Sequence, residues 1–162
     1  MVCATFVVVI LLEGSAFRRA DGTLAGPAHV TVPPPPPALH HVQGPLIHLP
    51  ADDAFTSADD LLTYRYMIWS TEGFPKLVNG ISGFLPRRTY ELDTVARRFP
   101  DQQSVAALRA AGIRSVVLHP ALAANTAWAE AASRPVAKLG IERRVEGDVV
   151  LFDLTPRSRA HR

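Results

Sequence analysis

The chain has 162 residues, of which 48% are hydrophobic and 20% charged, so it is long enough for one globular domain with a linker and too short for two full domains. This composition excludes a wholly disordered or collagen-like chain, and the single cysteine excludes an internal disulfide and a cysteine-rich zinc site. The 17 Lys+Arg against 15 Asp+Glu leave a net charge of +2, and the arginines are scattered as doublets, so the sequence does not indicate nucleic-acid binding.

An apolar run at residues 2–12 opens the chain, and Glu13 ends it. The run is too short to cross a membrane alone, because a spanning helix needs about 20 apolar residues. A signal peptide would carry basic residues before the run, whereas Arg18 and Arg19 follow it. A buried β-strand is a further alternative. We favour the interpretation that residues 1–14 are the second half of the last transmembrane helix of a longer membrane protein, of which this chain is a truncated part.

Residues 15–44 are predicted to form a linker, since they include the five consecutive prolines Pro33–Pro37. Such a run favours polyproline II and acts as a stiff spacer, with an SH3-type ligand as the alternative. The histidines in or near this segment are interpreted as solvated loop residues rather than metal ligands. They are His29, His40, His41 and His48.

Residues 45–156 are predicted to fold into a soluble α/β domain, followed by a basic tail at 157–162. The sequence PLIHLP at 45–50 is typical of a short buried strand between two prolines. Residues 56–60 offer caps for a helix start, and the aromatic-rich segment 64–69 is predicted to be a strand.

Two helices are predicted to follow. Residues 88–99 place apolar side chains at i, i+3, i+4 and i+7, which form one stripe toward the core, and Pro100 ends the helix. Asp101 or Ser104 can cap the second helix, and Gly112 supplies its left-handed C-terminal residue.

The rest of the domain is predicted to contain a buried strand at 113–119, an Ala-rich helix at 122–133, and strands at 141–146 and 149–154 joined by the turn Gly147-Asp148. The element order favours an α/β fold, with a small mixed sheet, flanking helices and a C-terminal β-hairpin. The partial apolar helix and the Pro-rich linker precede this fold.

Residues 64–90 are the strongest candidate for a binding surface, because they combine aromatic, amide and hydroxyl side chains in a segment too apolar for a solvated loop. Asn79-Gly80 and Ser82-Gly83 permit tight turns that would aim backbone amides at an anion or a sugar hydroxyl. The alternative is that the apolar residues of this segment plug the sheet. We expect Tyr66, Trp69, Asn79, Ser82 and Tyr90 to gather around one partly exposed concave surface. The predicted ligand-binding residues are Tyr66, Trp69, Asn79, Gly80, Ser82, Gly83, Tyr90 and His119.

The sequence carries no complete catalytic signature. Residues 80–84 place the second glycine one residue too early for a nucleophile elbow, and no phosphate-binding glycine motif is present. His119 at a strand end is a candidate general base, with Asp93 or Asp153 as an acidic partner, but such a histidine is more often a hydrogen-bonded structural residue. The sequence therefore predicts no catalytic residue, no metal site and no cofactor.

The chain carries a succession of segments: LLEG at 11–14, a Pro-rich tether, LIHLP, YMIWST, PKLVNGISGFLPRRTYEL, FPDQQSVAALRAAGIRSVVLH and a closing hairpin. This succession resembles the C-terminal soluble domain of polytopic bacterial membrane glycosyltransferases of the type C, protein-mannosyltransferase-like class. The resemblance covers nearly all of the chain. Its most specific part is Asn79-Gly-x-Ser-Gly-Phe84 with Pro86 and Tyr90, together with the strand that ends at His119.

The resemblance implies an enzyme whose catalytic acid lies near its first membrane helices and whose donor is a polyprenyl-phosphate sugar. No catalytic residue is carried over, because this chain holds none of those helices. The expected function is that of an accessory extracytoplasmic domain, held at the cell membrane by the apolar segment. It would contact an acceptor glycan or a lipid-linked sugar without being catalytic alone.

Other interpretations remain open. Arg18 and Arg19 lie directly after the apolar run, and by the positive-inside rule they favour a cytoplasmic location of the domain that follows. Two charges after a last helix are a weak signal. The first alternative function is a free-standing secreted or membrane-anchored binding or interaction module. The second is an autonomous hydrolase that uses His119.

Overall fold

The computed structural model describes residues 17–18, 24–25, 31–51, 60–80 and 86–155. The chain divides into two compact units, Met1–Val32 and Pro33–Arg162. In the first unit, β1 (Phe17–Arg18) and β2 (Leu24–Ala25) pair in antiparallel orientation. The apolar run at 2–12, the expected cap at 56–59 and the tail at 157–162 lie outside the described residues. Within the described ranges, no helix has both the length and the apolar character that a membrane span requires.

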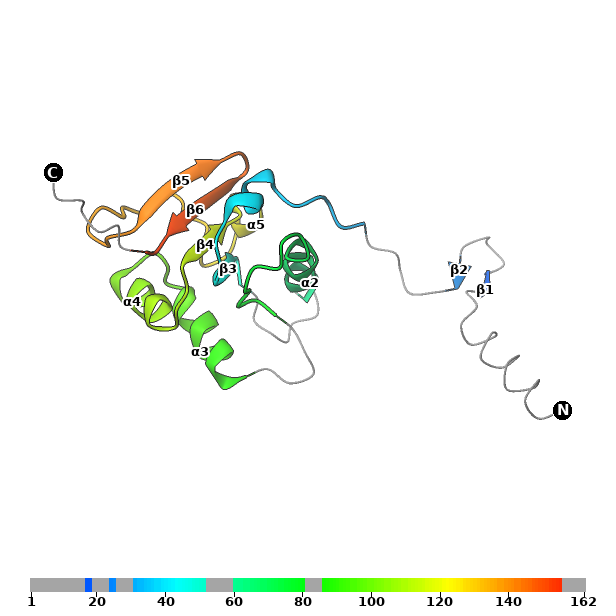
Figure 1. Ribbon diagram of the computed structural model, residues 1–162, viewed down its shortest axis with the longest axis horizontal. Coiled ribbons are helices and arrows are strands. Elements are labelled where there is room, and N and C mark those ends of the chain that lie inside the picture. Colours follow the sequence, from blue (N-terminus) through cyan, green and yellow to red (C-terminus); the bar gives the residue numbers. More distant parts are fainter. Residues whose placement is uncertain (1–16, 19–23, 26–30, 52–59, 81–85, 156–162) are drawn as a thin grey trace. The chain divides into compact units, whose positions relative to one another are not determined.

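A four-stranded mixed sheet forms the centre of the second unit, with the strand order β3-β4-β6-β5. The strands β3 (Leu46–Leu49) and β4 (Ser115–Leu118) are parallel. The strand β6 (Val149–Asp153) runs antiparallel to β4 and to β5 (Glu142–Glu146), as Figure 1 shows. The predicted α/β fold with a mixed sheet and a C-terminal hairpin is therefore confirmed.

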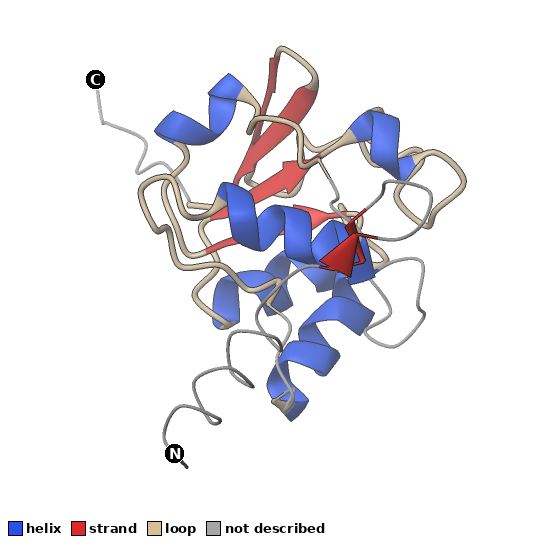
Figure 2. Cartoon of the chain, turned by 90° about the vertical axis from the view of Figure 1, so that its right-hand side faces the viewer, coloured by secondary structure: helices blue, strands red, loops and turns tan. Residues whose placement is uncertain are grey.

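One face of the sheet carries the larger part of the core. Side chains alternate between the two faces of a strand, so every second residue of β3, β4 and β6 points to this side. These residues pack against α3 (Arg87–Ala96), α4 (Gln102–Ala110) and the segment 124–141. Figure 2 shows the strands of the sheet with helices around them. The buried residues of the three strands on this face are Ile47, Leu49, Val116, Leu118, Val150 and Phe152.

The opposite face of the sheet is covered by residues from the N-terminal part of the unit. The 3-10 helix η1 (Pro37–His41) places Ala38 against Leu46, Val117 and Leu151. Because Pro36 and Ala38 are buried, the packed part of the chain extends into the Pro-rich segment that the sequence predicted to be a linker.

The segment predicted to be a strand at 64–69 belongs instead to the helix α2 (Asp60–Trp69), so that prediction was wrong. The helix buries Tyr66 and Trp69 on one side and leaves Tyr64 and Ile68 about half exposed on another. Apolar side chains therefore surround the helix, and the sequence lacks the amphipathic period that would have marked it. Aromatic residues are also frequent in strands, which favoured the wrong assignment.

The helix predicted at 122–133 is also shorter than expected. Only α5 (Pro120–Ala123) is helical, and residues 124–134 form a series of turns. Asn125 adopts a positive φ of 65°, which interrupts a helix. The Arg143 side chain then donates to the backbone carbonyls of Ala132 and Arg134, so a neighbouring strand supplies hydrogen bonds that a helix would make internally.

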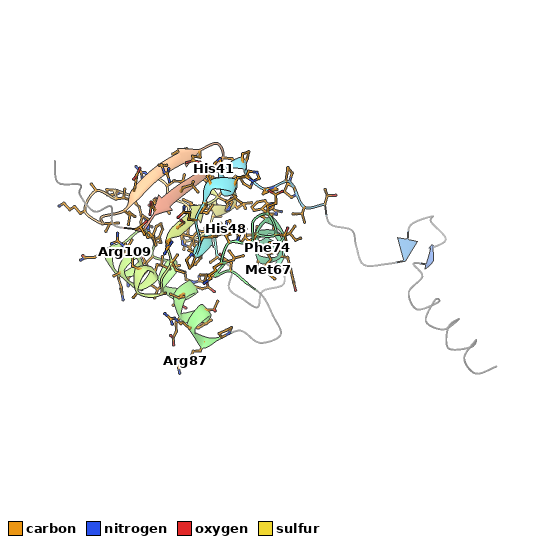
Figure 3. The ribbon with its side chains drawn as sticks, in the orientation of Figure 1. His41, His48, Met67, Phe74, Arg87 and Arg109 are labelled. Carbon is orange, nitrogen blue, oxygen red and sulfur yellow. The ribbon has the colours of Figure 1, made fainter. Side chains whose placement is uncertain are left out.

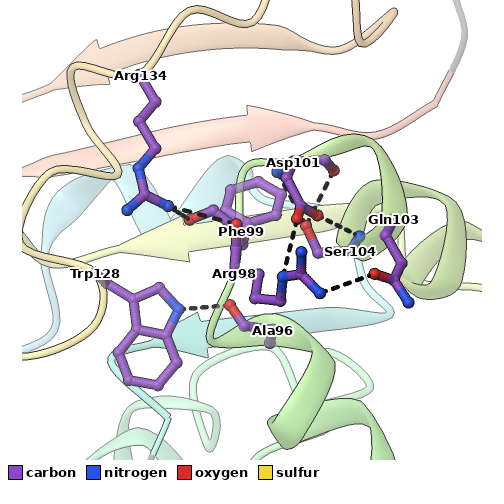
Figure 4. A network of polar contacts seen from close by, with 8 residues as sticks. All are labelled: Ala96, Arg98, Phe99, Asp101, Gln103, Ser104, Trp128 and Arg134. Carbon is purple, nitrogen blue, oxygen red and sulfur yellow. Dashed lines mark hydrogen bonds and ion pairs between the residues drawn. The ribbon is translucent and has the colours of Figure 1, made fainter.

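The connection between α3 and α4 follows the sequence prediction closely. Asp101 caps α4 by accepting a hydrogen bond from the Ser104 backbone at 2.7 Å, and the Ser104 hydroxyl accepts one from the Asp101 backbone at 3.1 Å. The indole of Trp128 donates to the Ala96 carbonyl at 2.6 Å, and Arg134 donates to the carbonyl of Phe99 (Figure 4). These contacts tie the end of α3, the start of α4 and the turns at 124–134 into one packed layer.

Candidate functional site

A pair of buried histidines lies where the parallel strands β3 and β4 end. In the strand register His48 lies opposite Val117, and His119 follows two residues later on the same face. The His48 Nδ1 and His119 Nε2 atoms are 2.9 Å apart, so one ring donates a hydrogen bond to the other. Both side chains are at most 4% exposed, and Figure 3 places His48 inside the domain, whereas Arg87 lies at its edge.

Two aromatic side chains of α2 cover this histidine pair. Tyr66 stacks on His48 with ring centroids 4.5 Å apart and an interplanar angle of 12°, and on His119 at 5.3 Å and 16°. Trp69 lies one helical turn later and is tilted against His119 at 5.4 Å. The Tyr66 hydroxyl donates to the Pro50 carbonyl at 3.2 Å, so its polar end is satisfied although the side chain is fully buried.

Asn79 holds the backbone of His48 from the outer edge of the sheet. Its side-chain oxygen accepts from the His48 backbone N–H at 2.5 Å, and its amide group donates to the His48 carbonyl at 3.0 Å. Leu46 exchanges backbone hydrogen bonds with Lys76 and Val78 just before it. Asn79 therefore completes the edge pairing of β3 and acts here as a positioning residue.

The burial of the two imidazoles determines their charge. Desolvation lowers the pKa of His119 to about 4, with a smaller lowering from Arg65 and an opposing effect of Asp148. Burial also lowers the pKa of His48 well below its usual value, and repulsion from His119 acts in the same direction. Both rings are therefore neutral at pH 7, as expected for a hydrogen-bonded pair in which one nitrogen donates and the other accepts.

A groove of about 350 Å³ opens beside this buried cluster. Its volume is at the lower end of the range of about 300 to 1,000 Å³ found for small-molecule sites. The Trp69 indole donates to the Pro33 carbonyl at 2.7 Å, which holds the proline run along the groove, and the Arg65 guanidinium lies 5.9 Å from the Trp69 ring centre. The residues that line the groove are Pro33–Pro37, Arg65, Trp69, His119, Ala121, Leu122 and Asp148.

A second cavity of about 300 Å³ lies between residues 41–43 and the strands β4, β6 and β5. Its charged lining residues are exposed or partly exposed, and Arg144 forms a long ion pair of 4.0 Å with Glu146 on the same strand. Phe152 is the buried aromatic residue of its lining, and no buried imidazole borders this cavity among the residues that the structure describes, so the groove at Trp69 is the stronger candidate.

The structure brings together only some of the residues that the sequence singled out. Tyr66, Trp69 and His119 contact one another around His48, and Asn79 lies against the backbone of that histidine. Tyr66, Trp69 and Asn79 are buried rather than partly exposed, and only Trp69 and His119 line the groove.

Two other predicted ligand-binding positions, Gly80 and Tyr90, do not line the groove. Gly80 follows Asn79 in the chain and is exposed. Tyr90 is 58% exposed on α3 and is not among the rings that contact the histidine pair. Ser82 and Gly83 lie outside the described residues.

Sequence reasoning missed three residues of the site. His48 was interpreted as a solvated loop residue, but it is 2% exposed within β3. The signal was its place in the buried strand LIHL, because a parallel pairing with the strand that ends at His119 puts both rings on one face. Arg65 and Asp148 were missed because only the folded chain brings α2 and the β5–β6 turn to one groove.

The chain was compared with protein families, curated proteins and solved structures. None of them matches. In the described part of the chain, no group of three His, Cys, Asp or Glu side chains is arranged to hold a metal ion. The candidate function therefore depends on the geometry of the groove and on the resemblance noted from the sequence.

Proposed function

We propose that the chain is the accessory domain of a membrane glycosyltransferase-like protein and that it contacts an acceptor glycan or a lipid-linked sugar without transferring sugar itself. The observation that supports this proposal is the groove beside the histidine pair. It combines the Arg65 guanidinium and the Asp148 carboxylate with an apolar wall of prolines, and the nearly buried Trp69 and His119 form its base. Sites for sugars need polar groups beside apolar surface, because a sugar has both hydroxyl groups and apolar C–H faces.

The chemistry of His119 supports a binding role over a catalytic one. Its Nε2 atom is engaged with His48, and the pKa of about 4 makes the imidazole a weak base at neutral pH. A general base works best when its pKa lies near the working pH. We therefore assign His119 to the support of the groove rather than to proton transfer.

The proposed location is the outer side of the cell membrane, with the apolar segment 2–12 as the membrane anchor. The resemblance to the soluble domain of type C enzymes supports this location. The remaining parts of the parent protein would supply the donor site and the catalytic acid. Placement of both reactants contributes about 7 to 11 kcal/mol to such reactions, so a domain without the donor site is expected to be inactive.

The proposal is tested by presenting the full-length chain to an array of glycans and to immobilised polyprenyl-phosphate sugars. The chain should be retained by at least one class of sugar, and Arg65→Gln should reduce the retention because it removes the guanidinium from the groove. Arg88→Gln, an exposed change on α3, is the matched control and should have no effect. If no glycan or lipid-linked sugar retains the chain, the proposed function is wrong.

A further inference from the structure

We infer that the groove lined by Pro33–Pro37, Arg65 and Asp148 binds an uncharged glycosyl unit and excludes phosphate, so that it holds the sugar part of its ligand. This inference rests on the proposed function and specifies the chemistry of the ligand. A glycosyl unit of this kind occurs both in acceptor glycans and in lipid-linked sugars.

The charges that line the groove cancel. Arg65 contributes one positive charge and Asp148 one negative charge, and His119 is neutral at pH 7 because its pKa is about 4. The Arg65 guanidinium also lies over the Trp69 ring, so a cation–π interaction attracts its positive charge to the indole face. Phosphate recognition depends on an excess of cations or on several converging N–H groups, and this groove offers no excess of cations.

The proline wall strengthens this argument. Proline has no backbone N–H, so five consecutive prolines offer apolar rings but no amide donors, and the carbonyls of Pro33 and Pro36 already accept hydrogen bonds from Trp69 and Leu39. Such a wall cannot form the nest of N–H groups that holds an anion. The Asp148 carboxylate instead accepts hydrogen bonds, and sugar hydroxyls can donate them.

The remaining lining fits the apolar side of a sugar ring. The proline rings, Ala121 and Leu122 offer aliphatic surface for sugar C–H groups. Arg65 supplies donors and Asp148 supplies acceptors, so adjacent hydroxyls of one sugar can be bound from both sides. A phosphate group would lie beside the Asp148 carboxylate, and this like-charge contact is unfavourable.

The test uses the two tryptophans of the chain as paired reporters. The Trp69 indole N–H lies at the groove, whereas the Trp128 indole N–H is buried against Ala96 in the other half of the core. The full-length ¹⁵N-labelled chain is kept in a polyoxyethylene detergent, whose headgroup carries neither sugar nor phosphate. The probes are the methyl glycosides of mannose, glucose and galactose, the 6-phosphates of the three sugars, inorganic phosphate, and undecaprenyl phosphate without sugar.

At least one methyl glycoside should shift the Trp69 indole resonance and leave that of Trp128 unchanged. The corresponding sugar phosphate should bind about tenfold more weakly or worse, because its charge meets the Asp148 carboxylate. Asp148→Asn removes a hydrogen-bond acceptor for sugar hydroxyls, so it should weaken binding of the methyl glycoside. The substitution also gives the groove a net positive charge, so the difference in affinity between the methyl glycoside and the sugar phosphate should become smaller or change sign. Glu130→Gln is the matched control, since it removes an exposed carboxylate outside the groove.

Each contrary result identifies which statement fails. If a sugar phosphate, inorganic phosphate or undecaprenyl phosphate binds more tightly than the neutral glycosides, the groove is an anion site and the inference is wrong, while the proposed function is decided by retention on the array. If Glu130→Gln changes the preference as much as Asp148→Asn does, the ligand does not bind at this groove. If no probe shifts Trp69 and the array also retains nothing, the proposed function fails together with the inference.

Discussion

Acidification should destabilise this domain through its buried histidine pair. An unfolded histidine has a pKa of about 6.5, whereas burial holds the pKa of folded His119 at about 4. Between these values the unfolded chain binds a proton that the folded chain does not, so the free energy of unfolding falls as the pH falls from about 6.5 to about 4. Below that window His119 is protonated in both states and adds no further loss.

The expected loss follows from the size of the shift. One pKa unit corresponds to about 1.4 kcal/mol, so the shift of His119 gives about 3 kcal/mol across the window. His48 is shifted in the same direction and adds to this loss. Since a domain of this size has a stability of about 5 to 15 kcal/mol, the effect is a large part of the total.

Urea denaturation followed by circular dichroism at a series of pH values measures this effect. The wild-type chain should lose about 3 kcal/mol or more between pH 7 and pH 4, and His119→Gln should have a shallower dependence although it is less stable at pH 7. His41→Gln, an exposed change in η1, should keep the wild-type slope. Equal slopes for His119→Gln and the wild type would refute the reasoning, as would an NMR titration of folded His119 with an unshifted pKa.

Three further results are expected. Gly112→Ala should lower the free energy of unfolding by about 1 kcal/mol in a thermal or urea melt, because Gly112 has a φ of 83°. Gly80→Ala should lower it less, since Gly80 has no left-handed φ and no close neighbour, and equal losses would contradict this reason. Arg109→Met should lower the free energy of unfolding by about 2 kcal/mol, because it leaves three backbone carbonyls without their donor. The exposed change Arg88→Met should alter it by less than about 0.5 kcal/mol, and equal losses in the two variants would show that the carbonyl contacts do not matter. The chain incubated with polyprenyl-phosphate sugars and acceptor glycans should show no sugar transfer by mass spectrometry, and turnover that His119→Ala abolishes would contradict the non-catalytic assignment.

The elements with clear local signals could be predicted from the sequence. Proline boundaries and β-branched residues marked β3 and β4, a Gly-Asp turn marked the hairpin, and the Asp101 cap marked the start of α4. The helix α2 could not be recognised, because its exposed Ile68 and Tyr64 remove the contrast between a buried and a polar side. The turns after α5 accept hydrogen bonds from Arg143, which lies beyond the segment itself on β5, so the pattern within the segment does not mark them.

The candidate site was predictable only in its individual parts. The aromatic residues Tyr66 and Trp69 and the strand-end His119 were noticed for their chemistry. Their association with His48 requires the pairing of two parallel strands whose connection includes α2, α3 and α4, and such long-range pairing leaves no trace in a local window. Arg65 and Asp148 line the same groove for the same reason, since neither segment by itself marks them as part of a site.

The hydrogen bond between the Trp69 indole and the Pro33 carbonyl has a mechanical consequence. Pro33 is the point at which the preceding chain enters the domain, so a pulling force on that chain reaches this bond before it reaches β3. Rupture of the bond would release the start of the proline run up to η1, because these prolines have no backbone N–H groups to form further hydrogen bonds that resist the load. The groove would then lose part of its wall.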